Sequence, residues 1–358
     1  MNKFKREAIR IGMRAAVRFP ALLPRALAKY FKKLWNKNQL ENARALYAAG
    51  NFSPRKEELP HGMRILDLSC TSGFGESVHP CARYIPEGIG EGRWRYVMTL
   101  TPLPQGIEYF ENPEFLVSAD GEEWRLPRGG KSPLIPAPSD WVGYNSDPAL
   151  HCEGGKIYLI YRRSEYMRSG ASVRLLVTET EDCVKWSAPS IMMEEFHGER
   201  ELAVLMSPSV VRRGGEYFLW YVDGAGGVFS LMRARSGDML GWREASAAEI
   251  SGLPEGVEPW HAEVIEKDES ELLMTLCYQR AGNYKSDRGI AFASSRDGGV
   301  SWRVFGDAIE PGKYHFCKKS LYKGSLLRDE RGAFRLYFSG QDEENHWFTA
   351  LKSSGLPL

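Results

Sequence analysis

Three side chains stand out in this 358-residue sequence because their types suit acid and base chemistry. Asp147 directly precedes Pro148, and His261 lies two residues before Glu263, so that in a strand His261 and Glu263 share one face. A carboxylate can act as a base, and a histidine can donate a proton at neutral pH without a large pKa shift. Each also has a plainer interpretation, because an Asp before a Pro often belongs to a turn and a buried His often only fills a core.

A repeated architecture must position these residues, because one turn-like motif occurs four times. Its clearest copy is Ser-Arg-Asp-Gly-Gly-Val-Ser-Trp at residues 295–302, and weaker copies lie at 118–124, 180–186 and 236–242. The tryptophans that end the copies are 62, 56 and 60 residues apart. Asp and Gly suit a tight turn and Trp anchors the returning strand, so these motifs indicate structure rather than catalysis.

Around these motifs, three strand-like segments recur in five units. The second segment of each unit is rich in aromatic and large apolar residues and follows a Gly or acidic turn. The units cover residues 78–118, 147–178, 207–233, 261–294 and 324–351. Such spacing predicts an antiparallel all-β fold, and five sheets around an axis make a five-bladed β-propeller. The last unit has no room for a fourth strand, which residues 65–68 are predicted to supply.

The first fifty residues differ from the rest in charge. Residues 1–50 hold twelve Lys and Arg against two Glu, a net charge of +10, and the remainder carries −9. Their pattern predicts a basic α-helical arm, followed by a linker at 51–63 and the propeller at 64–358. The arm either contacts an anionic membrane or a protein partner, or packs on the body with its charges in solvent. Nucleic-acid binding is not expected.

Cysteines and apolar runs bear on location and cofactors. The six cysteines form no Cys-x-x-Cys pair and no Cys/His cluster with zinc spacing, so we expect reduced thiols, no metal centre and no cofactor. Arg10, Arg14 and Arg18 interrupt any apolar run that could serve as a signal peptide, and no window resembles a transmembrane helix. The expected location is cytoplasmic, with attachment to the membrane periphery through the arm as a variant.

The repeat also resembles a known group of proteins. Ser146, Asp147 and Pro148 precede Tyr-Leu-Ile-Tyr at 158–161, and Ser207 and Pro208 precede Tyr-Phe-Leu-Trp-Tyr at 217–221. This arrangement resembles the five-bladed propellers of the glycoside hydrolase family 43 and 32 superfamily, the relatives of arabinanase, levansucrase and invertase. The likeness covers residues 64–358. It implies a substrate funnel at the propeller axis, lined by the first residues of each innermost strand.

The resemblance further implies where catalytic acids should stand. Typical members carry Asp in the first two blades and Glu in the third, and the matching positions here are His79, Asp147 and Ser207. The chain is therefore identified as a divergent member. Inverting hydrolysis needs an acid and a base about 6.5–9.5 Å apart. We expect the catalytic residues to be Asp147, His261 and Glu263. We expect the substrate to contact His79, Ser207, Lys323, Ser325, Trp260 and Tyr144.

Two functions follow as expectations. The first is a carbohydrate-active propeller, a glycosidase-like or glycosyl-transferring enzyme that acts on a bacterial glycan at the axial funnel. The alternative is a non-catalytic glycan-binding propeller, for polysaccharide assembly or surface recognition, that has lost its catalytic acids. The polar ring favours the enzyme, and the acids missing from the first and third blades favour the binding protein.

Deleting residues 1–50 tests the membrane interpretation of the arm. If the basic residues hold the protein on an anionic bilayer, the truncated protein should move from the membrane to the soluble fraction on cell fractionation. An unchanged distribution of the truncated protein would instead favour the arm packed on the body.

Overall fold

The computed structural model describes residues 57–90, 93–138, 143–167, 170–197, 203–282, 288–309 and 312–356, with scattered positions between 27 and 45. The helical arm predicted for residues 1–50 therefore lies largely outside the described residues. Within the described part of the chain, no helix has both the length and the apolar character needed to cross a membrane.

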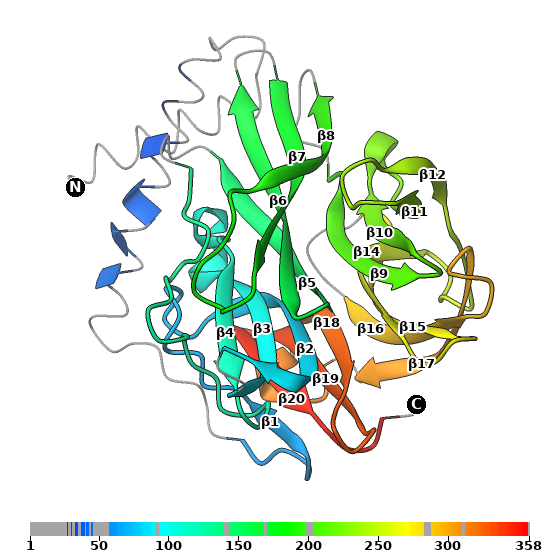
Figure 1. The fold of residues 1–358 in the computed structure, drawn as a ribbon. Coiled ribbons are helices and arrows are strands. Elements are labelled where there is room, and N and C mark those ends of the chain that lie inside the picture. The colour runs from blue at the N-terminus through cyan, green and yellow to red at the C-terminus, as the bar shows by residue number, and fades with distance from the viewer. Residues whose placement is uncertain are drawn as a thin grey trace.

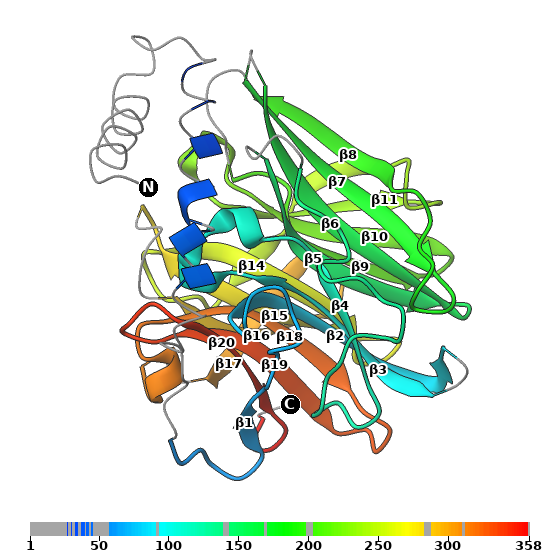
Figure 2. The same cartoon turned by 90° about the vertical axis from the view of Figure 1, so that its left-hand side faces the viewer.

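Five antiparallel sheets follow one another along the chain and surround a common axis, as Figures 1 and 2 show. Blade 1 consists of β2 (Ser77–Ile89), β3 (Trp94–Pro102) and β4 (Glu114–Ser118). Blade 2 consists of β5 (Tyr144–Glu153), β6 (Lys156–Met167), β7 (Gly170–Thr180) and β8 (Ser190–His197). Blade 3 consists of β9 (Met206–Arg213), β10 (Glu216–Asp223), β11 (Ser230–Ser236) and β12 (Arg243–Ala247).

Blades 4 and 5 complete the ring. Blade 4 consists of β14 (Val257–Glu266), β15 (Leu272–Arg280), β16 (Gly289–Ser295) and β17 (Ser301–Ile309), with β13 (Glu249–Ser251) pairing in parallel with β17. Blade 5 consists of β18 (Ser320–Arg328), β19 (Phe334–Gln341), β20 (Trp347–Lys352) and β1 (Met63–Ile65). Short 3-10 helices lie at η1 (Pro104–Gly106), η2 (Glu108–Phe110), η3 (Ala225–Gly227) and η4 (His315–Cys317). The prediction of an all-β, five-bladed propeller is confirmed.

An N-terminal strand closes the ring, as the sequence predicts. β1 pairs antiparallel with β20 (Figure 1), and the register places Arg64 opposite Leu351. The strand is centred slightly earlier than the predicted segment 65–68, and Leu66 continues the pairing with a hydrogen bond to the Thr349 carbonyl of 2.9 Å. Because the first and last strands of the propeller share one sheet, blade 5 joins the two ends of the ring.

The repeated Asp-Trp motifs form turns that also join neighbouring blades. In the fourth copy, Gly299 has φ 82°, and an added Cβ would lie 2.3 Å from the Trp220 ring of the preceding blade. The Trp220 indole donates to the Gly299 carbonyl at 3.1 Å. In the first copy, the Tyr337 hydroxyl donates to the Gly121 carbonyl at 2.7 Å, across the junction of blades 5 and 1. The structural interpretation of these motifs is therefore confirmed.

Asp297→Ala tests how much one such turn stabilises the fold. The Asp297 carboxylate accepts hydrogen bonds from the Ser295 hydroxyl at 2.7 Å, the Val300 amide at 3.1 Å and the Ser301 hydroxyl at 2.6 Å. We expect the variant to lose about 1–2 kcal/mol of unfolding free energy in denaturant titration. Glu255→Ala, on an exposed turn, serves as the control and should change it by less than about 0.5 kcal/mol.

The difference in unfolding free energy between wild type and Asp297→Ala should also depend on pH. Burial would raise the pKa of Asp297, but hydrogen bonds from Ser301 and Ser295 lower it from 3.8 to about 2. A carboxyl whose pKa is lower in the folded protein stabilises it above the unfolded pKa and loses this effect as the carboxyl is protonated. The stability difference between wild type and Asp297→Ala should therefore shrink as pH falls from 3.8 towards 2. A difference that stays constant over this range would contradict the assignment.

Candidate functional site

The innermost strands form a closed ring around the axis and supply the candidate site. β2, β5, β9, β14 and β18 each contact the next strand in this order, and β18 contacts β2. Successive positions facing the axis are two residues apart along each strand. The first such layer consists of His79, Asp147, Ser207, His261 and Lys323, one residue from each blade.

Unusual backbone conformations direct three of these side chains. His79, Asp147 and Ser207 have φ values of 57°, 50° and 51°, and each is followed by a proline. The pairing of β2 and of β5 with the next strand shifts register at His79 and at Asp147. Such bulges re-aim side chains, and left-handed non-glycine residues concentrate at functional sites, where the surrounding structure holds them. The same left-handed backbone conformation before a proline therefore orients one of these side chains in each of blades 1, 2 and 3.

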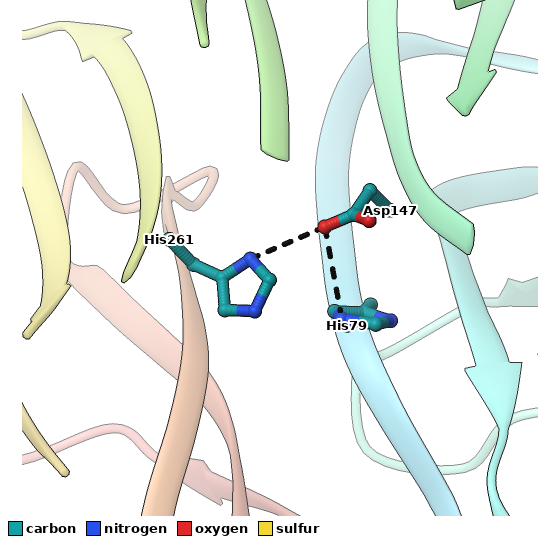
Figure 3. Close-up of side chains that lie close together, drawn as sticks. All are labelled: His79, Asp147 and His261. Atoms are coloured by element: carbon teal, nitrogen blue, oxygen red, sulfur yellow. Dashed lines mark ion pairs between the residues drawn. The ribbon is translucent and has the colours of Figure 1, made fainter. Parts of the chain in front are cut away.

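Asp147 and two histidines form a compact buried cluster (Figure 3). The Asp147 Oδ1 atom lies 3.2 Å from His261 Nδ1 and 3.7 Å from His79 Nε2. The exposed fractions of His79, Asp147 and His261 are 1%, 4% and 2%. The structure thus brings together three predicted site residues that are widely separated in sequence.

The Asp147 carboxylate is held as an anion by several donors. The Ser207 amide donates to Oδ1 at 3.1 Å, and the Ser146 hydroxyl donates to Oδ2 at 2.8 Å. Arg162, itself buried, donates to the Ser146 hydroxyl at 3.4 Å and to the Val204 carbonyl at 2.8 Å. Burial would raise the pKa of Asp147, but the neighbouring histidines and Arg162 lower it well below its usual range. The carboxylate is therefore charged and fixed in orientation at neutral pH.

Both histidines are neutral and, among the residues that the structure describes, present ring nitrogens without hydrogen bonds. Burial lowers the pKa of His79 and of His261, and the nearby Lys323 ammonium acts in the same direction. His79 Nδ1 shares a hydrogen bond of 2.8 Å with the Thr101 hydroxyl, whereas its Nε2 makes none within the described part of the chain. Neither ring nitrogen of His261 makes a hydrogen bond to a described residue, since its Nδ1 is close to Asp147 but poorly aligned. Unpaired buried nitrogens of this kind are rare and indicate a missing partner.

A divalent metal ion would fit this arrangement. His79, Asp147 and His261 each offer one ligand atom, and these atoms lie within 4.8 Å of one another. Two neutral imidazoles and a carboxylate are a donor set used by zinc, iron and related ions. The His79 ring, fixed at Nδ1 by Thr101, leaves Nε2 as its ligand atom. Sequence spacing did not reveal this group because its members come from three blades.

Aromatic rings and a guanidinium adjoin the cluster. Tyr322 lies with its ring centroid 4.5 Å from that of His261 and 5.1 Å from that of His79. Trp260 lies 5.5 Å from His261, and the Arg288 guanidinium is 4.8 Å from the Trp260 ring and 5.1 Å from the Tyr322 ring. Trp260 was predicted from the sequence. Arg162, Thr101 and Arg288 were not, because nothing in their local sequence distinguishes them.

Other predicted residues hold the blades together. Lys323 is 1% exposed, and its ammonium donates to the Pro148 carbonyl at 2.9 Å. The Ser207 hydroxyl donates to the Ala262 carbonyl at 2.8 Å, and the Ser325 hydroxyl accepts from the Ala82 amide at 2.9 Å. Tyr144 begins β5, three residues ahead of Asp147.

Glu263 lies in the next layer and is separate from the cluster. It shares a face with His261, as alternation predicts, but its Oε1 accepts from Arg83 at 2.5 Å and from the Cys81 thiol at 3.0 Å. Its Oε2 accepts from the Leu326 amide at 3.1 Å. These contacts engage both oxygens of the Glu263 carboxylate within the core.

Comparison with known proteins supports the fold. No family model matches the chain. The chain is 24% identical over 317 residues to the A type blood N-acetyl-alpha-D-galactosamine deacetylase of Flavonifractor plautii, a match covering 74% of this chain. The chain spans only 40% of that relative's length.

Solved structures give the same result. The crystal structure of an N-acetylgalactosamine deacetylase from F. plautii, in complex with blood group B trisaccharide, matches with a TM-score of 0.70 and 17% identity over 80% of this chain and 92% of that one. Sucrose-6-phosphate hydrolase from Lactobacillus gasseri matches with a TM-score of 0.60 and 14% identity over 87% of this chain and 63% of that one. A thermostable family-43 glycoside hydrolase matches with a TM-score of 0.54 and 12% identity over 80% and 95%. The likeness is one of fold. It confirms the resemblance to the five-bladed propellers of glycoside hydrolase families 43 and 32.

Metal binding can be measured directly on the full-length protein. After removal of bound metal with a chelator, titration calorimetry with Mn²⁺ or Zn²⁺ should detect one site, and Asp147→Asn or His261→Gln should weaken it at least about tenfold. His61→Gln, at an exposed position, should leave the affinity unchanged. Equal affinities in all four proteins would show that the cluster is not a metal site.

Proposed function

We propose that this protein binds a glycan at the mouth above the cluster and removes the acetyl group from an N-acetylated amino sugar. The observation that carries the proposal is the group of His79, Asp147 and His261, with its unpaired ring nitrogens, on the axis. The similarity to a deacetylase of acetylated galactosamine supports the choice of bond.

Inverting glycoside hydrolysis is a poorer match to this site. It needs two carboxyl groups that face the same glycosidic bond across a water. In the first axial layer, Asp147 is the single carboxylate, because His79 and Ser207 occupy the positions of the other two acids. Glu263 cannot replace them, since Arg83, Cys81 and the Leu326 amide already engage it. The site has a carboxylate and two bases instead of an acid pair.

The residues of the cluster suit amide hydrolysis. A bound divalent ion supplies a Lewis acid that polarises a carbonyl and favours the ionisation of water. Asp147 contributes the negative charge that holds the cation, and the two neutral imidazoles contribute lone pairs. Hydrolysis adds one water across the acetyl C–N bond. The water oxygen bonds to the acetyl carbon, which leaves as acetate, and the two water protons pass to the sugar nitrogen, which leaves as an ammonium group. The rings of Trp260 and Tyr322 offer apolar faces for a sugar beside the cluster.

A non-catalytic glycan-binding protein is the second candidate. Its support is the burial of the cluster, whose three side chains are each at most 4% exposed. A sealed polar cluster can serve as a structural plug below a binding surface. The two candidates differ in whether a bound glycan is chemically changed.

The experiment screens a glycan array for binding and then incubates each bound glycan with the protein, measuring released acetate and free monosaccharide. We expect acetate release from glycans with N-acetylated amino sugars, and a loss of on the order of 10² or more in rate for His261→Gln and Asp147→Asn. His61→Gln is the control and should keep the wild-type rate.

Other outcomes separate the alternatives. Binding without any product would make the protein a glycan-binding propeller. Release of monosaccharide without acetate would restore the glycosidase expectation. Addition of a chelator should stop acetate release and excess Mn²⁺ or Zn²⁺ should restore it; release that is insensitive to the chelator would contradict a role for the metal.

A further inference from the structure

A cavity lies at the end of the propeller axis opposite the histidine cluster. A third layer of side chains lies four residues beyond the first layer on each innermost strand. At the usual rise of a strand, the two layers are about 13 Å apart. The residues of the third layer are Arg83, His151, Val211, Ile265 and Leu327. A cavity of about 420 Å³ opens there, lined by residues from all five of these strands. The layer between the two ends contains Glu263 and Cys81, and Arg83 reaches Glu263 from the cavity side. The cavity is therefore separate from the histidine cluster.

One of the arginines at this cavity lacks a carboxylate partner among the described residues, so the charges around the cavity do not balance. Three lining or neighbouring arginines are paired: Arg83 with Glu263 at 2.5 Å, Arg212 with Glu153 at 3.1 Å, and Arg213 with Glu266 at 3.0 Å. Arg328 lines the cavity as well, and its Nε donates to the Gly332 carbonyl at 3.0 Å. Among the residues that the structure describes, Arg328 has no carboxylate partner within 4.0 Å. The excess of a single positive charge suits a monoanion.

A buried histidine adds a neutral polar group to the cavity wall. His151 is 9% exposed, and its Nε2 makes no hydrogen bond with any described residue, although Glu153 Oε2 lies 3.5 Å away. Its ring is flanked by those of Tyr158 and Tyr217, at 6.0 Å and 5.8 Å between centroids. Burial lowers the pKa of His151, so the ring is neutral at pH 7. The unpaired Nε2 is therefore a second sign that this wall faces a polar ligand.

We propose that this cavity binds a sugar acid, a monosaccharide unit that carries one carboxylate. The Arg328 guanidinium provides a planar donor pair that matches a carboxylate. The Glu266 carboxylate, whose Oε1 pairs with Arg213, and the His151 ring provide partners for hydroxyl groups. The volume of about 420 Å³ accommodates a ligand of monosaccharide size. This site goes beyond the proposed deacetylation and does not depend on it, because it lies at the other end of the axis.

The experiment titrates full-length protein with glucuronate, with glucose as the neutral match and glucose 6-phosphate as the dianionic one, by calorimetry. We expect glucuronate to bind at least about tenfold more tightly than either comparison ligand. Arg328→Gln should weaken glucuronate binding by about tenfold or more, and His151→Gln should weaken it as well. Arg331→Gln, three residues further on the same turn and exposed, should leave the affinity within about twofold of wild type.

Two further measurements test whether glucuronate binds in this cavity. His261→Gln should leave glucuronate binding unchanged, because the histidine cluster lies in another layer. Thermal unfolding of Arg328→Gln should match the wild type, because Arg328 is exposed and the fold tolerates replacement there. The proposal is overturned by the absence of glucuronate binding at millimolar concentration, by equal binding of glucose, by tighter binding of the phosphate, or by an Arg328→Gln variant that binds like wild type.

Discussion

The burial of one charged carboxylate on the propeller axis is the constraint on which the site depends. A carboxylate that is 4% exposed is stable only where donors and positive charges replace the water it has lost. Asp147 obtains these from a backbone amide of blade 3, a hydroxyl of its own strand and a buried arginine behind that hydroxyl. These partners come from blades 2 and 3, so the charge is held only when these two blades pack against each other.

The packing of the sheets also holds the strained backbone in place. Left-handed φ values at three non-glycine residues before prolines cost energy locally, on the order of 1–3 kcal/mol each. The surrounding sheets offset this cost, because the adjoining strands pair regularly and the Asp-Trp turns join one blade to the next. Blades 1, 2 and 3 use the same conformation for His79, Asp147 and Ser207. Changing the residue type at such a position therefore changes the chemistry of the site while the backbone stays as it is.

The features that could be predicted from the sequence are those that depend on local residue patterns. Alternating aromatic strands and four spaced turn motifs identified five blades and the strand that closes them, and the proline positions identified Asp147. The separation of His261 from Glu263 could not be predicted in this way. Alternation puts both on one face, but the partners of each side chain come from other blades. Arg83 and Cys81 of blade 1, about 180 residues away in sequence, donate to Glu263. Arg162 and Thr101 were missed for the same reason.

The middle layer decides how the two ends of the axis can act. Glu263 accepts three hydrogen bonds there, and the hydroxyls of Ser325 and Ser209 bind backbone amides of neighbouring blades. These bonds satisfy the polar groups of the layer without a ligand, so the layer functions as a structural partition. A glycan or metal at the histidine cluster and a sugar acid at the opposite cavity would then bind independently, and each end can change its residues without altering the other. The hydrogen bonds that Glu263 accepts from Cys81, Arg83 and the Leu326 amide belong to this partition.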